Sequence, residues 1–173
     1  MNEAMGEVKR MLKYNIAFIC KGDRILMLNR SKAPLLGLWN GVGGKLEPGE
    51  TPYASVVREI REETGLRLAE EALRFSGIVT WEVDGREAGG MYVFIGEAPP
   101  EALAEAPVET EDGILAWKAL EWVIHPDNHG VAGHVKHFLP PMLESRDCAE
   151  YRCTFQEGKL LNCEVRPLEE VVL

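Results

Sequence analysis

The segment from Leu38 to Leu66, which reads LWNGVGGKLEPGETPYASVVREIREETGL, constrains local structure more than any other part of the chain. Thr51 followed by Pro52 is typical of the N-cap and first position of a helix, and Gly65 is typical of the residue that ends one. The segment therefore predicts a glycine-rich turn and then a helix over residues 52–64. Largely apolar side chains recur along this helix at steps of three and four residues: Ala54, Val56, Val57, Ile60 and Thr64.

Three carboxylates crowd the exposed side of the predicted helix. Helical geometry places residues i, i+3 and i+4 on one face, so Glu59, Glu62 and Glu63 should converge. Arg58 lies four residues before Glu62 and can offset part of the charge. The pair Glu59 and Glu63 still costs about a few tenths of a kcal/mol without a counter-ion. Taken alone, an acidic helix face is ordinarily just solvated.

The preceding glycine pair, Gly43-Gly44, favours a second interpretation of the carboxylates. Backbone without side chains can approach them closely and present carbonyl oxygens. Carboxylate and carbonyl oxygens are hard ligands that suit Mg²⁺ or Mn²⁺, and Mg²⁺ commonly completes its shell with substrate phosphates. The segment thus predicts a site for a metal-bound phosphate ester or anhydride.

Length and charge limit the class of protein. The 173 residues fit one domain, residues 1–173, and the net charge of −9 repels polyphosphate backbones, so no polymeric nucleic acid is expected as a partner. No apolar run is long enough for a transmembrane helix, so no membrane association is expected. The cysteines include no C-x-x-C pair or zinc pattern, which favours reduced thiols in a cytoplasmic protein: Cys20, Cys148, Cys153 and Cys163.

The remaining pattern predicts more strands than helices. A hairpin is expected from two β-rich runs separated by Lys21-Gly22-Asp23, and the C-terminal residues alternate like a second hairpin. A second helix is expected over residues 130–145, ending near Pro140. This order indicates an α+β fold with a mixed sheet covered by helices. The expected strands are residues 14–20, 24–30, 40–46, 74–83, 91–98, 114–120, 150–156 and 160–168.

The carboxylate segment resembles the Nudix box, G-x5-E-x7-R-E-U-x-E-E-x-G-U with U aliphatic, over residues 44–66. Every specified position is met at the correct spacing, and a match spread over loop, helix and helix stop is a strong signal. The resemblance implies a Nudix-type α/β/α sandwich with a C-terminal β-hairpin. The matching residues are Gly44, Glu50, Arg58, Glu59, Ile60, Glu62, Glu63, Gly65 and Leu66.

Nudix enzymes hydrolyse nucleoside diphosphates linked to another group with Mg²⁺ or Mn²⁺. The resemblance implies that Glu59, Glu62 and Glu63 are metal ligands assisted by the Gly43 carbonyl. Glu50 and Arg58 would hold the loop against the helix. A further acid outside the box often serves as base or ligand, and Asp112 is the candidate here. Glu109 and Glu111 are rivals, and a solvated acidic loop is the alternative.

Substrate-binding candidates lie in two segments. LWNGVGGK resembles the WNG-x-GGK segment of MutT-related enzymes that cleave 8-oxo-dGTP. This resemblance implies that Asn40 contacts the base through its side-chain amide. A turn-forming role before Gly41 is the alternative. Trp39, for which packing is favoured, and Lys45 complete this set. In HPDNHG, Asp127 and Asn128 are candidate base readers, with a turn before the second helix as the favoured alternative.

The sequence therefore predicts a Mg²⁺-dependent hydrolase that cleaves a small nucleoside triphosphate, with 8-oxo-dGTP as a candidate, to the monophosphate and pyrophosphate. Hydrolysis of another nucleoside-diphosphate-linked substrate is one alternative. The other is a non-catalytic Nudix module that senses a nucleotide, although such modules commonly lose the metal carboxylates that this chain retains.

Overall fold

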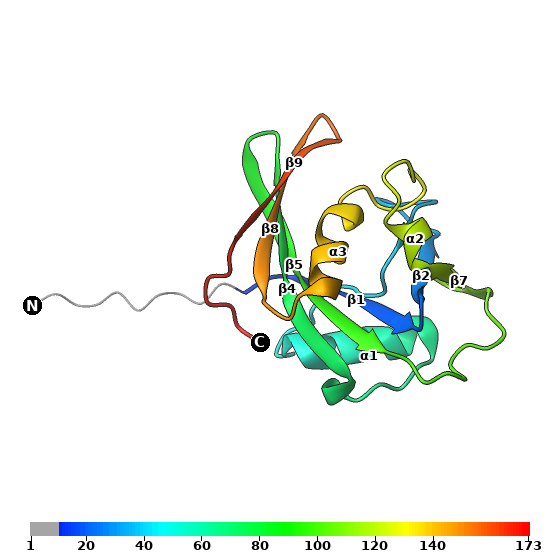
Figure 1. Ribbon diagram of the computed structural model, residues 1–173. Helices are drawn as coiled ribbons and strands as arrows, with labels where there is room; N and C mark the ends of the chain where they lie inside the picture. Colours follow the sequence, from blue (N-terminus) through cyan, green and yellow to red (C-terminus); the bar gives the residue numbers. More distant parts are fainter. Residues whose placement is uncertain (1–10) are drawn as a thin grey trace, which may run out of the picture.

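The computed structural model describes residues 11–173 as one mixed β-sheet with helices on both faces (Figure 1). The path through the sheet is β6-β7-β2-β1-β5-β4-β8-β9, and β3 pairs with β2. The β1–β5 and β4–β8 pairs are parallel, and the other neighbours are antiparallel. The strands are β1 Tyr14–Lys21, β2 Arg24–Arg30, β3 Trp39–Asn40, β4 Leu73–Val83, β5 Arg86–Glu97, β6 Val108–Thr110, β7 Gly113–Ala119, β8 Ala149–Gln156 and β9 Lys159–Pro167. The helices are α1 Pro52–Thr64, α2 Leu120–Val123 and α3 Val135–Glu144, with a 3₁₀ turn at Glu70–Ala72.

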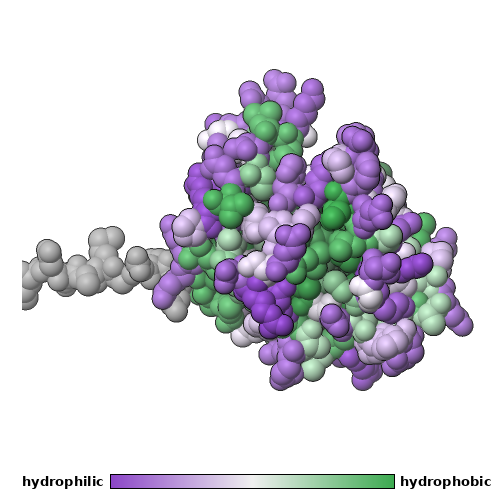
Figure 2. All heavy atoms as spheres, viewed as in Figure 1, coloured by the Kyte–Doolittle hydropathy of each residue, from purple (hydrophilic) through white to green (hydrophobic). Residues whose placement is uncertain are grey.

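Two apolar clusters hold the helices to opposite faces of the sheet. Side chains alternate along β1, so that Phe18 packs in the cluster containing Phe138 of α3, whereas Ile19 packs in the cluster containing Ile60 of α1. All four side chains are fully buried. This arrangement confirms the predicted α+β sandwich. Figure 2 shows that the surface on the viewed side is largely polar, with apolar patches between the polar residues.

The two predicted hairpins and the first helix are confirmed. The β4–β5 connection is tighter than expected, because only Asp84 and Gly85 form the turn and β5 already begins at Arg86. Both turn residues have positive φ, 50° and 78°, as hairpin turns that match the strand twist require. Three elements were missed by the sequence pattern: the short β6 inside the acidic loop, the 3₁₀ turn Glu70–Ala72 and the single-turn helix α2. The expected strand over residues 40–46 was wrong, because beyond Asn40 this segment pairs with β1 only through isolated bridges at Val42 and Lys45.

The predicted bounds of the second helix were wrong at both ends. Residues 130–134 are not helical, because Trp39 exchanges backbone hydrogen bonds with Gly130 and Ala132 (2.8 and 2.9 Å). At the other end α3 runs through Pro140 and Pro141 to Glu144. Met142, only 1% exposed, anchors this last turn in the apolar cluster, and its burial offsets the missing proline N–H groups.

The buried face of α1 also differs from the prediction. Ala54 is exposed, and the buried small residue is its neighbour Ser55, whose Oγ accepts a hydrogen bond from Asn15 Nδ2 (2.8 Å). Within residues 11–173, no helix has the length and apolar character needed to cross a membrane.

Packing around Phe138 is expected to contribute strongly to the stability of the fold. Its ring meets Phe18 edge-on, with centroids 5.8 Å apart, beneath α3. Phe138→Ala should lower the free energy of unfolding by about 3–5 kcal/mol, because it leaves a cavity in a buried cluster. The neighbouring exposed His137→Ala is the matched control and should change stability by about 0.5 kcal/mol or less. Denaturant unfolding of both variants measures the difference, and equal stability of the two would contradict the central position of Phe138.

Candidate active site

Helix α1 begins and ends on the residues that its sequence indicates. The Thr51 side chain accepts a hydrogen bond from the Ala54 amide (3.1 Å), and Pro52 occupies the first turn. Gly65 adopts the left-handed conformation (φ 75°), and its amide donates to the carbonyl of Arg61 (2.9 Å). These caps fix the rotation of the helix and therefore the direction of its glutamates.

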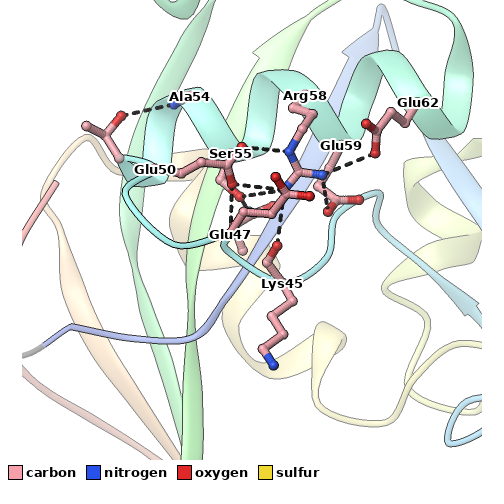
Figure 3. A network of polar contacts seen from close by, with 10 residues as sticks. Lys45, Glu47, Glu50, Ala54, Ser55, Arg58, Glu59 and Glu62 are labelled. Atoms are coloured by element: carbon pink, nitrogen blue, oxygen red, sulfur yellow. Dashed lines mark hydrogen bonds and ion pairs between the residues drawn. The ribbon is translucent and has the colours of Figure 1, made fainter.

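The Arg58 guanidinium is the centre of a polar network (Figure 3). It makes a bidentate contact with Glu50, through Nε to Oε1 (2.6 Å) and Nη2 to Oε2 (2.9 Å). Nη1 also donates to Glu59 (2.8 Å) and Glu62 (3.1 Å), and Nη2 donates to the carbonyl of Lys45 (3.1 Å). The planar Arg58 cation thus connects the loop to the helix and offsets the repulsion between the Glu59 and Glu62 carboxylates.

The Arg58 contact strongly favours the ionised form of Glu50. The hydrogen bond from Arg58 is the main reason that the pKa of Glu50 falls to about 2, with a smaller contribution from the Glu47 amide, which also donates to it (2.9 Å). The same pairing raises the pKa of Arg58.

Glu63 lies in a different environment from Glu62. It is only 8% exposed, and its Oε2 accepts a hydrogen bond from the Gly43 amide (3.0 Å), whereas the Glu62 side chain is 56% exposed. Burial raises the pKa of Glu63 to about 7, against the lowering effect of the Gly43 amide. The exposed acidic face expected from the sequence is therefore wrong for Glu63, which is buried, and for Glu59, whose side chain is 14% exposed.

The glycine pair passes through a narrow space, in which the backbone of β1 blocks a side chain at Gly43 and the Glu59 carboxylate crowds Gly44. A Cβ on Gly43 would lie 2.3 Å from the carbonyl oxygen of Asn15, and a Cβ on Gly44 would lie 2.6 Å from the carboxyl carbon of Glu59. The backbone N–H of Asn15 donates to the Gly44 carbonyl (2.9 Å), which attaches this segment to β1. The Gly43-Gly44 backbone therefore passes directly between β1 and the carboxylates of α1.

This constellation coincides with the region that matches a known family. The NUDIX domain family model matches residues 11–139, well over half of the chain. The chain belongs to the Nudix family. Membership confirms the resemblance seen in the sequence and indicates a pyrophosphohydrolase that acts on nucleotide-linked substrates. Nudix hydrolases generally use divalent metal ions such as Mg²⁺.

Individual relatives agree with this assignment. The chain is 29% identical over 118 residues to the uncharacterized Nudix hydrolase YvcI of Bacillus subtilis, covering 68% of this chain and 72% of that protein. It is 27% identical over 115 residues to the mouse oxidized purine nucleoside triphosphate hydrolase, covering 66% and 70%. The crystal structure of a MutT protein from Bacillus halodurans has the same fold, with a TM-score of 0.69 at 23% identity, over 89% of this chain and 97% of that one.

The residues of this Nudix site suit a hard divalent cation in chemistry and access. Glu59 and Glu63 offer carboxylate oxygens beside a backbone that has no side chains to block it. Among residues 11–173, no three His, Cys, Asp or Glu side chains lie close enough together to form a ready-made metal site. The fit to Mg²⁺ rests instead on the oxygen ligands beside the open backbone, because Mg²⁺ is bound by carboxylates and completes its shell with water and substrate phosphates.

Of the three candidate acids outside the box, Asp112 is the one whose charge raises the pKa of Glu63. Its charge contributes to the raised pKa of Glu63, and its Oδ1 lies 3.3 Å from Nζ of Lys32. Of the rivals, Glu109 is exposed in β6 and Glu111 is exposed in the turn between β6 and β7. Asp112 reaches this position because it immediately precedes β7, which pairs with β2.

The sequence pattern missed Arg30 and Asn15. Arg30 ends β2 close enough to Glu63 to lower its pKa, and its buried Nε has no hydrogen-bond partner. Asn15 is 3% exposed, and its Oδ1 also has no partner, although its Nδ2 is bound. An arginine that ends an apolar strand is a weak signal in sequence, because its neighbours come from elsewhere in the chain.

The residues expected to bind substrate are spread over several surroundings. Asn40 is 8% exposed, and its Oδ1 accepts a hydrogen bond from the Gly41 amide (2.9 Å), which is the turn-forming role. Lys45 is exposed, and Figure 3 shows its ammonium group pointing away from the Arg58 network. Asn128 binds the carbonyl of Trp122 (2.7 Å) and the amide of Gly130 (2.9 Å), so it stabilises a turn. Asp127 is exposed in the same turn.

Trp39 is packed against other side chains. Its ring meets Trp122 edge-on at 6.4 Å, and Nζ of Lys118 lies 4.3 Å from its centroid. It also borders a cavity of about 650 Å³ beside β7, lined in part by Lys21 and Trp117, to which the glutamates do not contribute. The glutamates of the Nudix box therefore lie outside this cavity.

Acid should weaken the Glu50–Arg58 contact. The pKa of Glu50 in the folded chain, about 2, lies below its ordinary value, so the unfolded chain takes up the proton first as pH falls. The stabilising contribution is complete above about pH 4.5 and is lost as pH falls toward 2. Glu50→Gln should therefore lower stability most near neutral pH, and its deficit relative to the unmodified protein should shrink in acid. Urea unfolding across this range measures the deficit, and a deficit independent of pH would contradict the ion pair.

Proposed function

We propose that this Nudix protein hydrolyses a nucleoside triphosphate to the monophosphate and pyrophosphate, with oxidised purine nucleotides such as 8-oxo-dGTP as candidate substrates. The observation that carries the proposal is the approach of Glu59 and Glu63 to the Gly43-Gly44 backbone. The mouse relative, named for hydrolysis of oxidized purine nucleoside triphosphates, supports this substrate class.

The proposed metal ligands are Glu59, Glu62 and Glu63, assisted by the Gly43 carbonyl. A bound Mg²⁺ or Mn²⁺ supplies Lewis acidity toward a phosphoryl oxygen and lowers the pKa of water. Glu62 already lies beside Glu59, because both carboxylates accept a hydrogen bond from Nη1 of Arg58.

The remaining residues position the reacting groups and move the proton. Arg58 keeps Glu59 oriented, and the Gly43 amide keeps Glu63 oriented. In this proposal Glu63 is a metal ligand, and Asp112, whose charge acts on Glu63, is the candidate that takes the proton from the attacking water. Arg30 and Lys32 place positive charge near Glu63 and Asp112, where a polyphosphate would carry its negative charge.

Removing single carboxylates tests the assignment. Glu63→Gln and Glu62→Gln should each lower kcat by about 100-fold or more while the fold persists, because each removes a charge needed in the reaction. Glu70→Gln, on the exposed 3₁₀ turn, is the matched control and should retain full activity. The assay follows pyrophosphate and phosphate separately for a panel of nucleotides with Mg²⁺.

Two outcomes of this assay separate the alternatives. Full activity of both Glu63→Gln and Glu62→Gln would contradict the metal assignment. Release of phosphate from diphosphates, with no pyrophosphate from triphosphates, would instead support the activity for which the human relative 8-oxo-dGDP phosphatase NUDT18 is named.

Asn40 tests the choice of base. Asn40→Ala should raise KM for 8-oxo-dGTP more than KM for dATP if the amide contacts the oxidised base, because only that substrate loses a specific hydrogen bond. Steady-state kinetics with both nucleotides measures the two ratios. Equal increases would limit Asn40 to the turn that it forms with Gly41.

A further inference from the structure

Two cysteines face each other across the C-terminal hairpin. Cys153 in β8 and Cys163 in β9 are direct partners in the antiparallel register, and their Sγ atoms are 3.2 Å apart. Directly opposed residues in antiparallel strands have Cα atoms about 4.5–5.5 Å apart, inside the range of about 4.4–6.8 Å that a disulfide tolerates. Both residues are free thiols. Because they are directly paired, the backbone already has the spacing that a disulfide between them needs.

The other two cysteines lack such a partner thiol. Cys20 lies in β1, and Cys148 precedes β8 with its Sγ 3.5 Å from the carbonyl oxygen of Phe75. Both are partly exposed, as Cys163 is. They therefore serve as internal controls for general thiol reactivity at similar exposure.

We propose that Cys153 and Cys163 form a reversible intrachain disulfide by exchange with a low-molecular-weight disulfide such as oxidised glutathione. The Cys163 thiolate attacks one sulfur of the oxidant, forms a mixed disulfide and releases one thiol. Cys153 then loses its proton and attacks Sγ of Cys163, which releases the second thiol. Two protein thiols and one oxidant disulfide become one protein disulfide and two thiols, so two electrons pass from the protein to the oxidant.

The surroundings of the pair set the order of these steps. Cys163 is half-buried and open to an oxidant, whereas Cys153 is fully buried beneath it. The Cys153 S–H group donates to Cys163 Sγ, which lowers the pKa of Cys163 and raises that of Cys153. Cys163 is therefore the attacking sulfur and Cys153 the resolving one.

The disulfide would fasten an edge strand to the sheet. β9 ends the strand order, and within residues 11–173 the one strand it pairs with is β8. The register of this pair is irregular between Thr154 and Phe155, directly after Cys153. Cys153 also lies opposite Trp81 of β4 and belongs to the cluster that contains α3. A covalent link at this point ties the exposed strand to the buried one, so fraying of β9 becomes harder.

Glutathione redox buffers test the proposal on the intact chain. After incubation of the reduced protein and alkylation, peptide mass mapping should find Cys153 joined to Cys163 with the loss of two hydrogens. The link should form at least about tenfold faster than glutathione adds to Cys20 or Cys148, because the Cys153 S–H group stabilises the attacking Cys163 thiolate, whereas burial raises the pKa of Cys20 and Cys148. Amide hydrogen exchange along β9 should also slow in the oxidised protein. Excess reduced glutathione should restore both thiols.

Matched variants identify the order of attack. Cys153→Ser should stop at a glutathione adduct on Cys163, Cys163→Ser should form no link, and the double variant Cys20→Ser/Cys148→Ser should behave like the unmodified protein. A stable glutathione adduct on Cys163 of the unmodified protein, or equal oxidation rates at all four cysteines, would overturn the proposal. The unmodified protein decides that outcome even if a serine variant fails to fold.

Discussion

The contact between one guanidinium and the surrounding carboxylates makes the rest of the site possible. Clustered glutamates on a helix repel one another, and a glycine-rich loop has little side-chain packing of its own. Arg58 offsets both costs, since its donors bind Glu50 from the loop and Glu59 and Glu62 from the helix. The side chain of Arg58 is about one-fifth exposed, at 22%, so solvent screens these contacts only in part.

The sheet then determines where this network stands. Because β1 is buried on both faces, α1 must lie flat against one of them, and the Gly43-Gly44 backbone is attached to the edge of the same strand. The carboxylates consequently meet a backbone that no side chain covers. A rigid strand, a capped helix and an unobstructed loop together give the precision that phosphoryl chemistry needs.

Local signals predicted the helix α1 and both hairpins well, because caps and turn residues act on their immediate neighbours. They failed where distant contacts prevail. Residues 130–134 read as helix but pair with Trp39, and Pro140 read as a stop although Met142 beyond it is buried. Ser55 is buried in place of Ala54, because Asn15, far away in sequence, supplies a hydrogen-bond donor for the serine hydroxyl.

The contiguous carboxylate segment by itself determined the family, because the specified positions of the Nudix box lie at fixed spacing within a single loop and helix. Only the tertiary structure decided which glutamate is buried, which outer acid approaches it, and that Arg30 lies nearby. It also decided that Cys153 and Cys163 touch while Cys20 and Cys148 do not share such a contact. Burial and electrostatic coupling depend on distances between segments that the sequence separates, and those distances exist only once the sheet has assembled.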